Sequence, residues 1–127
     1  MRPEKDDRAY LWDMLAAAKA VVSFVQGRTL EEYEANLMLR SAVERQVEIV
    51  GEAARRVSKT FQETHAEIPW RPIQAQRHVL AHDYGEIKHD RVWRVAVDHI
   101  PALIALLEPL LPAVPEENAR VPDTNCP

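Results

Sequence analysis

Residues 37–60 read LMLRSAVERQVEIVGEAARRVSKT, which is the most regular stretch of the chain. Apolar side chains recur in it at steps of three and four residues, the spacing of one face of an α-helix. These positions are Leu39, Ala42, Val43, Val47, Val50, Ala54 and Val57. The charged side chains lie mostly outside this stripe, and Gly51 permits close approach of a second helix. We therefore predict one long amphipathic helix. Its basic residues Arg55, Arg56 and Lys59 are expected on a solvated face, with contact to RNA phosphates as the alternative.

The preceding residues show the same periodicity, which predicts a helix of about twenty residues that packs on the first. Its apolar positions are Leu11, Met14, Leu15, Ala18, Val22 and Val25. Gly27 is a suitable residue to end this helix. Thr29 and Glu32 then have the spacing of a capping box, which predicts a short helix over Leu30 to Glu34.

Prolines divide the second half of the chain. Pro69 breaks the pattern, because the residue before a proline avoids helical angles, and Pro72 suits the first turn of a helix that runs to about His82. A last helix begins near Asp90, and Pro101 should kink it or divide it in two. The sequence thus predicts an all-α, up-down bundle of four main helices plus short helices.

Length and composition predict one soluble domain. The chain has 127 residues, of which 46% are hydrophobic and 28% charged. We assign residues 1–111 to a helical domain and residues 112–127 to a proline-rich flexible tail. No apolar run approaches the roughly 20 residues needed to span a bilayer, and the N-terminus is charged where a signal peptide is apolar. With Cys126 as the one cysteine, we expect a cytoplasmic protein.

The net charge of −4 argues against a protein that coats nucleic acid with its whole surface. Residues 66–99 carry as many basic as acidic side chains, and all five histidines lie between His65 and His99. Groups that titrate near neutral pH are therefore concentrated in this block. Any RNA site would be local.

Arg77 and His82 are the strongest candidates for chemistry. Five residues on a helix correspond to about 7.5 Å along the axis and roughly 140° around it, so the two side chains do not share a helix face. They converge on one substrate if His82 lies at the helix end beside Gly85, or if two copies of the helix line a groove between subunits. A histidine can move the proton of a ribose 2′-hydroxyl, and an arginine fork can hold the scissile phosphate.

Other chemistries and purely structural roles stay open on spacing alone. No carboxylate cluster is available to hold Mg²⁺, which disfavours a two-metal nuclease. His78 and His82, with His89 as a third ligand, have the spacing of a zinc site, although the glutamate of zinc-protease helices is missing. The simplest expectation for several others is structural: a half-buried Tyr84, Trp70 and Trp93 as core anchors, and His65 and His99 in structural roles.

Four spaced motifs in this order resemble the HepT-like toxins of the HEPN superfamily. They are Val50–Arg56, Ile68–Trp70, Arg77–Tyr84 and Val92–Trp93, and the similarity covers roughly Ala9 to Leu111. The resemblance implies a helical homodimer with the motif helices facing each other across a cleft. It also implies an RNase toxin of a prokaryotic toxin–antitoxin system, without a cofactor.

The resemblance assigns roles to individual residues. Arg77 and His82 take the catalytic positions, and Tyr84 is the tyrosine to which a nucleotidyltransferase antitoxin of the minimal type transfers AMP. A phosphate-bearing adduct two residues from His82 would add bulk and negative charge that repel RNA. The family usually has a small polar residue where this chain has His78, so we expect His78 to support the site or contact RNA.

Two readings compete with the RNase. The same helices could form a non-catalytic module that holds a nucleotide or docks the nucleotidyltransferase, or a purely structural dimerisation domain. The acidic net charge favours these two, and the arginine–histidine–tyrosine set favours the RNase.

Overall fold

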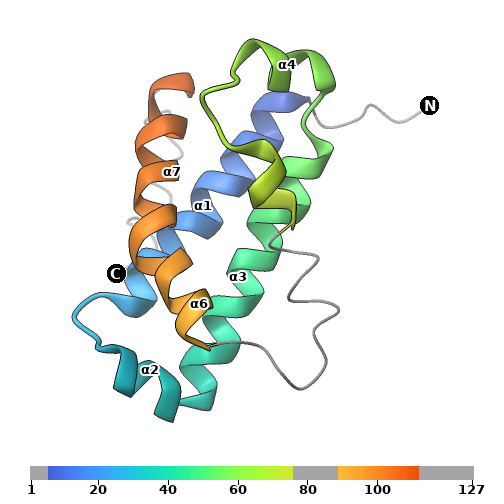
Figure 1. Ribbon diagram of the computed structural model, residues 1–127. Coiled ribbons are helices and arrows are strands. Elements are labelled where there is room, and N and C mark those ends of the chain that lie inside the picture. The colour runs from blue at the N-terminus through green and yellow to red at the C-terminus, as the bar shows by residue number, and fades with distance from the viewer. Residues whose placement is uncertain (1–5, 76–88, 112–127) are drawn as a thin grey trace, which may run out of the picture.

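The computed structural model describes residues 6–75 and 89–111, and within these ranges every regular element is helical (Figure 1). The predicted all-α fold is confirmed. The elements are α1 (Asp7–Val25), α2 (Leu30–Ala35), α3 (Leu37–Arg56), α4 (Lys59–Thr64), a helical segment at 70–75, α6 (His89–Arg94), the π-helical turn η1 (Val95–His99), α7 (Ile100–Leu107) and the 3₁₀ turn η2 (Glu108–Leu110).

Helix starts are fixed by side chains that the sequence places at the N-caps. The Ala9 N–H donates to Asp6 at the start of α1, and the Leu39 N–H donates to Asn36 at the start of α3. The predicted capping box is present, with Thr29 and Glu32 each accepting from the other's backbone N–H. Gly27 follows α1 with a φ of +74°, in the left-handed region that favours glycine.

The core lies between α1 and α3, with α7 covering the other side of α1. In Figure 1, α1, α3 and the α6–α7 segment run alongside one another, with α2 at one end and α4 at the other. The predicted stripes of both long helices are largely buried, and so is Gly51. No polar or charged residue in the described ranges is buried as a whole. The bundle is therefore held together mainly by apolar contacts.

The structure corrects the predicted end of α3. The expected helix to Thr60 ends at Arg56, and a new helix, α4, begins after Ser58. The Ser58 hydroxyl accepts from the Phe61 N–H, while its own N–H and hydroxyl donate to Asp7 at 2.8 and 2.7 Å. Asp7 is 51 residues away, so this end point depends on a tertiary contact. Arg55 and Arg56 are exposed as predicted.

Pro101 divides the last helix, as predicted, and a π-helical turn accommodates the division. A proline in a regular α-helix removes one hydrogen bond, and its ring clashes with the carbonyl four residues earlier, here that of Val97. In the structure, the Ile100 N–H instead bonds to the Val95 carbonyl five residues back. The wider turn lets α6 and α7 continue in one direction.

Several predictions lie outside the described residues. These are the part of the 72–82 helix beyond residue 75, the turn at Gly85 and the tail at 112–127. The start of that helix is observed, because residues 70–75 are helical with Pro72 in the first turn. None of the helices described here is long and apolar enough to cross a membrane.

Candidate functional site

The predicted catalytic segment is bracketed by described residues on both sides. Arg77, His78, His82 and Tyr84 lie outside the described ranges, and with them the proposed zinc ligands other than His89. The residues just before and after the segment, Ile73 and Arg91, line the same cavity. The chain thus leaves the described fold and returns to it at a single groove.

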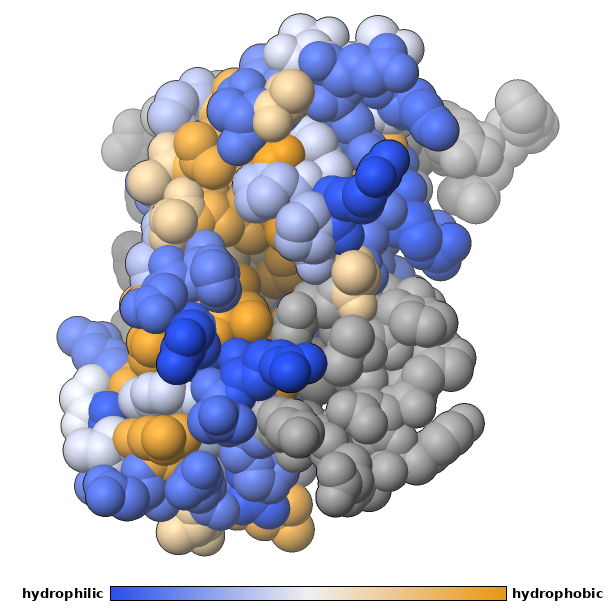
Figure 2. Space-filling model, viewed as in Figure 1, coloured by the Kyte–Doolittle hydropathy of each residue, from blue (hydrophilic) through white to orange (hydrophobic). Residues whose placement is uncertain are grey.

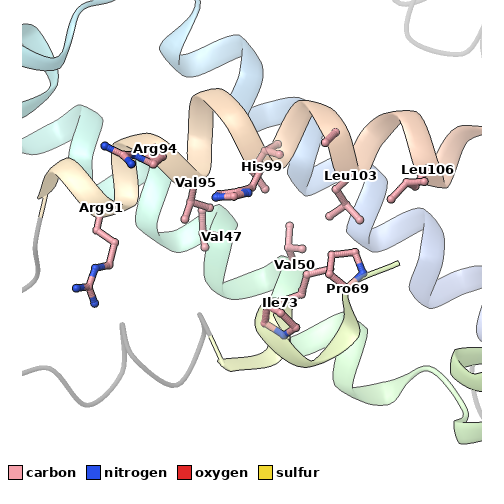
Figure 3. Close-up of a pocket in the computed structure, with 13 residues that line it drawn as sticks. Val47, Val50, Pro69, Ile73, Arg91, Arg94, Val95, His99, Leu103 and Leu106 are labelled. Carbon is pink, nitrogen blue, oxygen red and sulfur yellow. The ribbon is translucent and has the colours of Figure 1, made fainter. Parts of the chain in front are cut away.

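This groove has a volume of about 430 Å³ and lies between α3, α7, the η1 turn and residues 69–73 (Figure 3). Its floor is apolar and consists of buried side chains from α3 and α7. The lining residues are Val47, Val50, Pro69, Pro72, Ile73, Arg91, Arg94, Val95, His99, Ile100, Ala102, Leu103 and Leu106. In Figure 2, apolar surface is visible on this face of the molecule with hydrophilic surface beside it.

One end of the groove is cationic. Arg91 and Arg94 project from α6, and His99 from the η1 turn lies further along the same wall, next to apolar side chains (Figure 3). All three residues are exposed, and no aspartate or glutamate is among the lining residues that the structure describes. The ion pairs of the described residues involve other side chains, so no described carboxylate neutralises these arginines. The groove therefore combines an apolar floor with free positive charge.

A buried polar cluster holds the start of α6, where the chain returns from the catalytic segment. The Tyr33 ring on α2 is fully buried and contacts Trp93 at 5.4 Å and His89 at 6.5 Å between ring centroids. Burial, with a contribution from Glu44, raises the pKa of Tyr33. Burial also raises the pKa of Glu44, against the lowering effects of His89 and Arg40.

Two polar atoms in this cluster are unsatisfied. Among the residues that the structure describes, the Tyr33 hydroxyl and the His89 Nδ1 are buried without a hydrogen-bond partner. Most buried polar groups in proteins are hydrogen-bonded, so two such atoms at the same place are uncommon. No local pattern indicates this cluster, because Tyr33 and Glu44 are distant from His89 in the chain.

The structural roles predicted for aromatic side chains can be checked against the burial and the contacts of each side chain. Trp70 is buried, and its indole N–H donates to the His65 carbonyl at 3.0 Å. Trp93 packs against the core, and His65 stacks on Phe61 at 4.4 Å. These three expectations are confirmed.

His99 differs from its predicted role. It was expected to be structural, and it is exposed on the wall of the groove. Its position on the wall depends on the η1 turn, which the sequence did not predict.

The described residues form an all-α fold, and the segments on either side of residues 76–88 line one groove. The chain belongs to the HepT-like ribonuclease family: the family model described as "Ribonuclease HepT-like" matches residues 14–110. The matched range includes α1 from Met14 onward, all of α3, the residues that line the groove and the sequence from Arg77 to Tyr84.

Individual relatives agree with this assignment. The chain is 32% identical over 100 residues to "Putative RNase MJ1380" of Methanocaldococcus jannaschii, covering 79% of this chain and 92% of that protein. It is 29% identical over 107 residues to "Probable ribonuclease HepT" of Thermococcus cleftensis, covering 84% of this chain and 97% of that protein. No solved structure shows a significant match to the chain.

Proposed function

We propose that this protein is the RNase toxin of a prokaryotic toxin–antitoxin pair and cuts RNA in a cleft between two copies of the chain. The family match over residues 14–110 carries the proposal, because this range includes Arg77, His82 and Tyr84 in the spacing of the family motif. The names of the relatives, which refer to RNases, support the same activity.

In the proposed reaction, the ribose 2′-oxygen attacks the adjacent phosphorus and the 5′-oxygen leaves. His82 takes the proton from the 2′-hydroxyl or delivers one to the leaving oxygen, and in a dimer the two copies of His82 can divide these tasks. Arg77 holds the phosphate and stabilises the charge that develops in the transition state. His78 supports the site or contacts RNA. The two residue types supply proton transfer and charge stabilisation without a metal ion.

Silencing is proposed to act at Tyr84. Its phenolic oxygen would attack the α-phosphorus of ATP bound to a minimal nucleotidyltransferase antitoxin, and pyrophosphate would leave. The resulting AMP adduct, two residues from His82, would obstruct the cleft and repel RNA through its negative charge.

Two substitutions test the proposal. His82→Ala should abolish both RNA cleavage and growth inhibition, while circular dichroism shows a folded protein. Tyr84→Phe should leave cleavage and toxicity intact but make the toxin resistant to the co-expressed nucleotidyltransferase. Intact mass and peptide mapping of the wild-type chain should then show AMP on Tyr84. Cleavage that persists in purified His82→Ala would contradict the catalytic assignment.

The competing function is a non-catalytic module that binds a nucleotide or docks the nucleotidyltransferase. The net charge of −4 favours it, because RNA is an anion. In that case purified wild-type protein would bind the nucleotidyltransferase and leave RNA uncut under all conditions tested.

A further inference from the structure

The groove beside α6 has a chemistry that the predicted catalytic residues do not explain. Its apolar floor is formed by side chains such as Val47, Val50 and Leu103, which are buried yet line an open cavity. Its volume of about 430 Å³ is in the range of pockets that hold small organic ligands. A ligand that fills it must therefore present an apolar or aromatic surface.

The charges on the rim require the same ligand to carry negative charge. Arg91 and Arg94 are three residues apart on α6 and so lie on one face of that helix. Both are exposed and unpaired with any described carboxylate, in a protein whose net charge is −4. An arginine fork without an ion-pair partner among the described residues is well suited to a phosphate.

His99 connects these two features. Among the described lining residues it is the one with an aromatic ring, and it lies next to apolar side chains on the same helical wall as the arginines (Figure 3). Histidine rings are among the surfaces on which unpaired RNA bases stack. The groove thus offers phosphate contacts, a stacking ring and an apolar floor in succession, which matches the repeating chemistry of a single RNA strand.

We propose that this groove is a nucleotide subsite for single-stranded RNA, in which Arg91 and Arg94 hold phosphates and His99 stacks on a base. The proposal rests on the proposed RNase function and adds a substrate-binding site made of described residues outside the arginine–histidine motif. Ile73 and Arg91, which flank the catalytic segment, both line the groove. A strand bound here is therefore adjacent to the ends of that segment.

A second copy of the chain is a less suitable occupant of the groove. In a two-fold symmetric contact the same surface patch meets itself. Such a contact would bury Arg91 and Arg94, to which the described lining residues offer no carboxylate, and burying an unpaired charge is unfavourable.

The test compares Arg91→Ala/Arg94→Ala with Arg55→Ala/Arg56→Ala, which removes the same charge from exposed positions on α3 outside the groove. Both are made in the full chain carrying His82→Ala, so that RNA stays intact. Binding of a fluorescein-labelled oligouridine is measured by anisotropy over a range of salt concentrations. The groove variant should bind about tenfold or more weakly, and the magnitude of its salt slope should fall by about 1.4, as expected for two lost contacts to a single strand. The Arg55/Arg56 variant should keep the parent slope.

His99 gives an independent test of the base contact. His99→Ala should weaken binding about fivefold or more, whereas His99→Phe, which keeps a planar ring, should stay within about twofold of the parent. Equal losses in both variants, or no loss in either, would overturn the stacking role.

Several outcomes would overturn the subsite. One is a groove variant that binds the oligonucleotide like the Arg55/Arg56 variant. Another is a groove variant whose molecular mass in light scattering differs from that of the parent while its RNA affinity, expressed per oligomer, is unchanged. This result would make the groove an interface between copies of the chain. Unfolding curves establish that each variant is folded.

Failure of the subsite can be told apart from failure of the proposed function. If His82→Ala abolishes cleavage while the groove variant still binds RNA normally, the subsite alone is wrong. If the wild-type protein never cleaves RNA but the groove variant loses RNA binding, the RNase proposal is wrong and the groove is an RNA site of a non-catalytic protein.

Discussion

The interface between α1 and α3 and the wall formed by α6, η1 and α7 are built from similar apolar residues. They differ in the apolar surface and the polar groups that they leave without a contact partner. The first is a dry contact between two amphipathic helices with caps at their N-termini. The second has an apolar groove and a π-helical turn, and within the described part of the chain its two arginines have no ion-pair partner and the polar cluster at its start contains two buried atoms without a hydrogen-bond partner. This difference indicates that the contact of α1 with α3 mainly stabilises the fold, whereas α6, η1 and α7 form the candidate groove together with residues of α3.

The largest expected effect comes from the α1–α3 core. Leu11 is 2% exposed, and Leu11→Ala removes apolar contacts and leaves a cavity, which should lower the free energy of unfolding by about 3 kcal/mol. Leu37→Ala is the control, because Leu37 is 68% exposed and should change it by less than about 0.5 kcal/mol. Urea unfolding followed by circular dichroism measures both. Similar losses of unfolding free energy in the two variants would contradict the assignment of Leu11 to the core and Leu37 to the surface.

In the polar cluster, removal of a side-chain group should raise the free energy of unfolding, which is the opposite of the effect in the core. Tyr33→Phe removes a buried hydroxyl without a partner and should raise the free energy of unfolding by about 1 kcal/mol. Trp70→Phe removes an indole N–H that donates to the His65 carbonyl, so it should lower stability. The same urea unfolding measurement applies. A clear loss of stability in Tyr33→Phe would show that the hydroxyl has a partner in solution, such as a buried water.

The smallest expected effect depends on pH. The pKa of Glu44 is raised in the folded protein, chiefly by burial, so the ionised form of this carboxyl opposes folding. Its favourable contribution is fully present below the unfolded pKa of 4.5 and is lost as pH rises through the folded pKa.

Glu44→Gln should therefore be more stable than the wild type at pH 7, and this advantage should disappear below about pH 4. Thermal unfolding of both proteins at pH 4 and pH 7 measures the difference, with Glu63→Gln on the exposed surface of α4 as the control. An advantage that is the same at both pH values would exclude ionisation of Glu44 as its cause.

The sequence predicted the helices well because their signals are local. The apolar stripes of the two long helices, the capping box at Thr29 and the stop at Gly27 depend on residues within a few positions of each other, and all are observed. The end of α3 was placed too late, because the apolar pattern continues through Val57 and the competing signal is the contact of Ser58 with Asp7, 51 residues away.

The candidate site was predictable only in part. The motif from Arg77 to Tyr84 was visible as a spacing, and the roles of its residues remain predictions because they lie outside the described residues. The groove was not visible, because its lining comes from three separate parts of the chain. Two arginines spaced by three and a histidine five residues later gave no reason to expect a common surface.

The sequence by itself determined the all-α class, the two long amphipathic helices and the family, since periodicity, capping and spaced motifs are properties of the chain alone. The tertiary structure decided where Arg91, Arg94 and His99 meet an apolar floor and where Tyr33 and His89 are buried together. These features depend on how α6, η1 and α7 pack against α2 and α3. Packing joins residues that are distant in sequence, and no local pattern records which of them will meet.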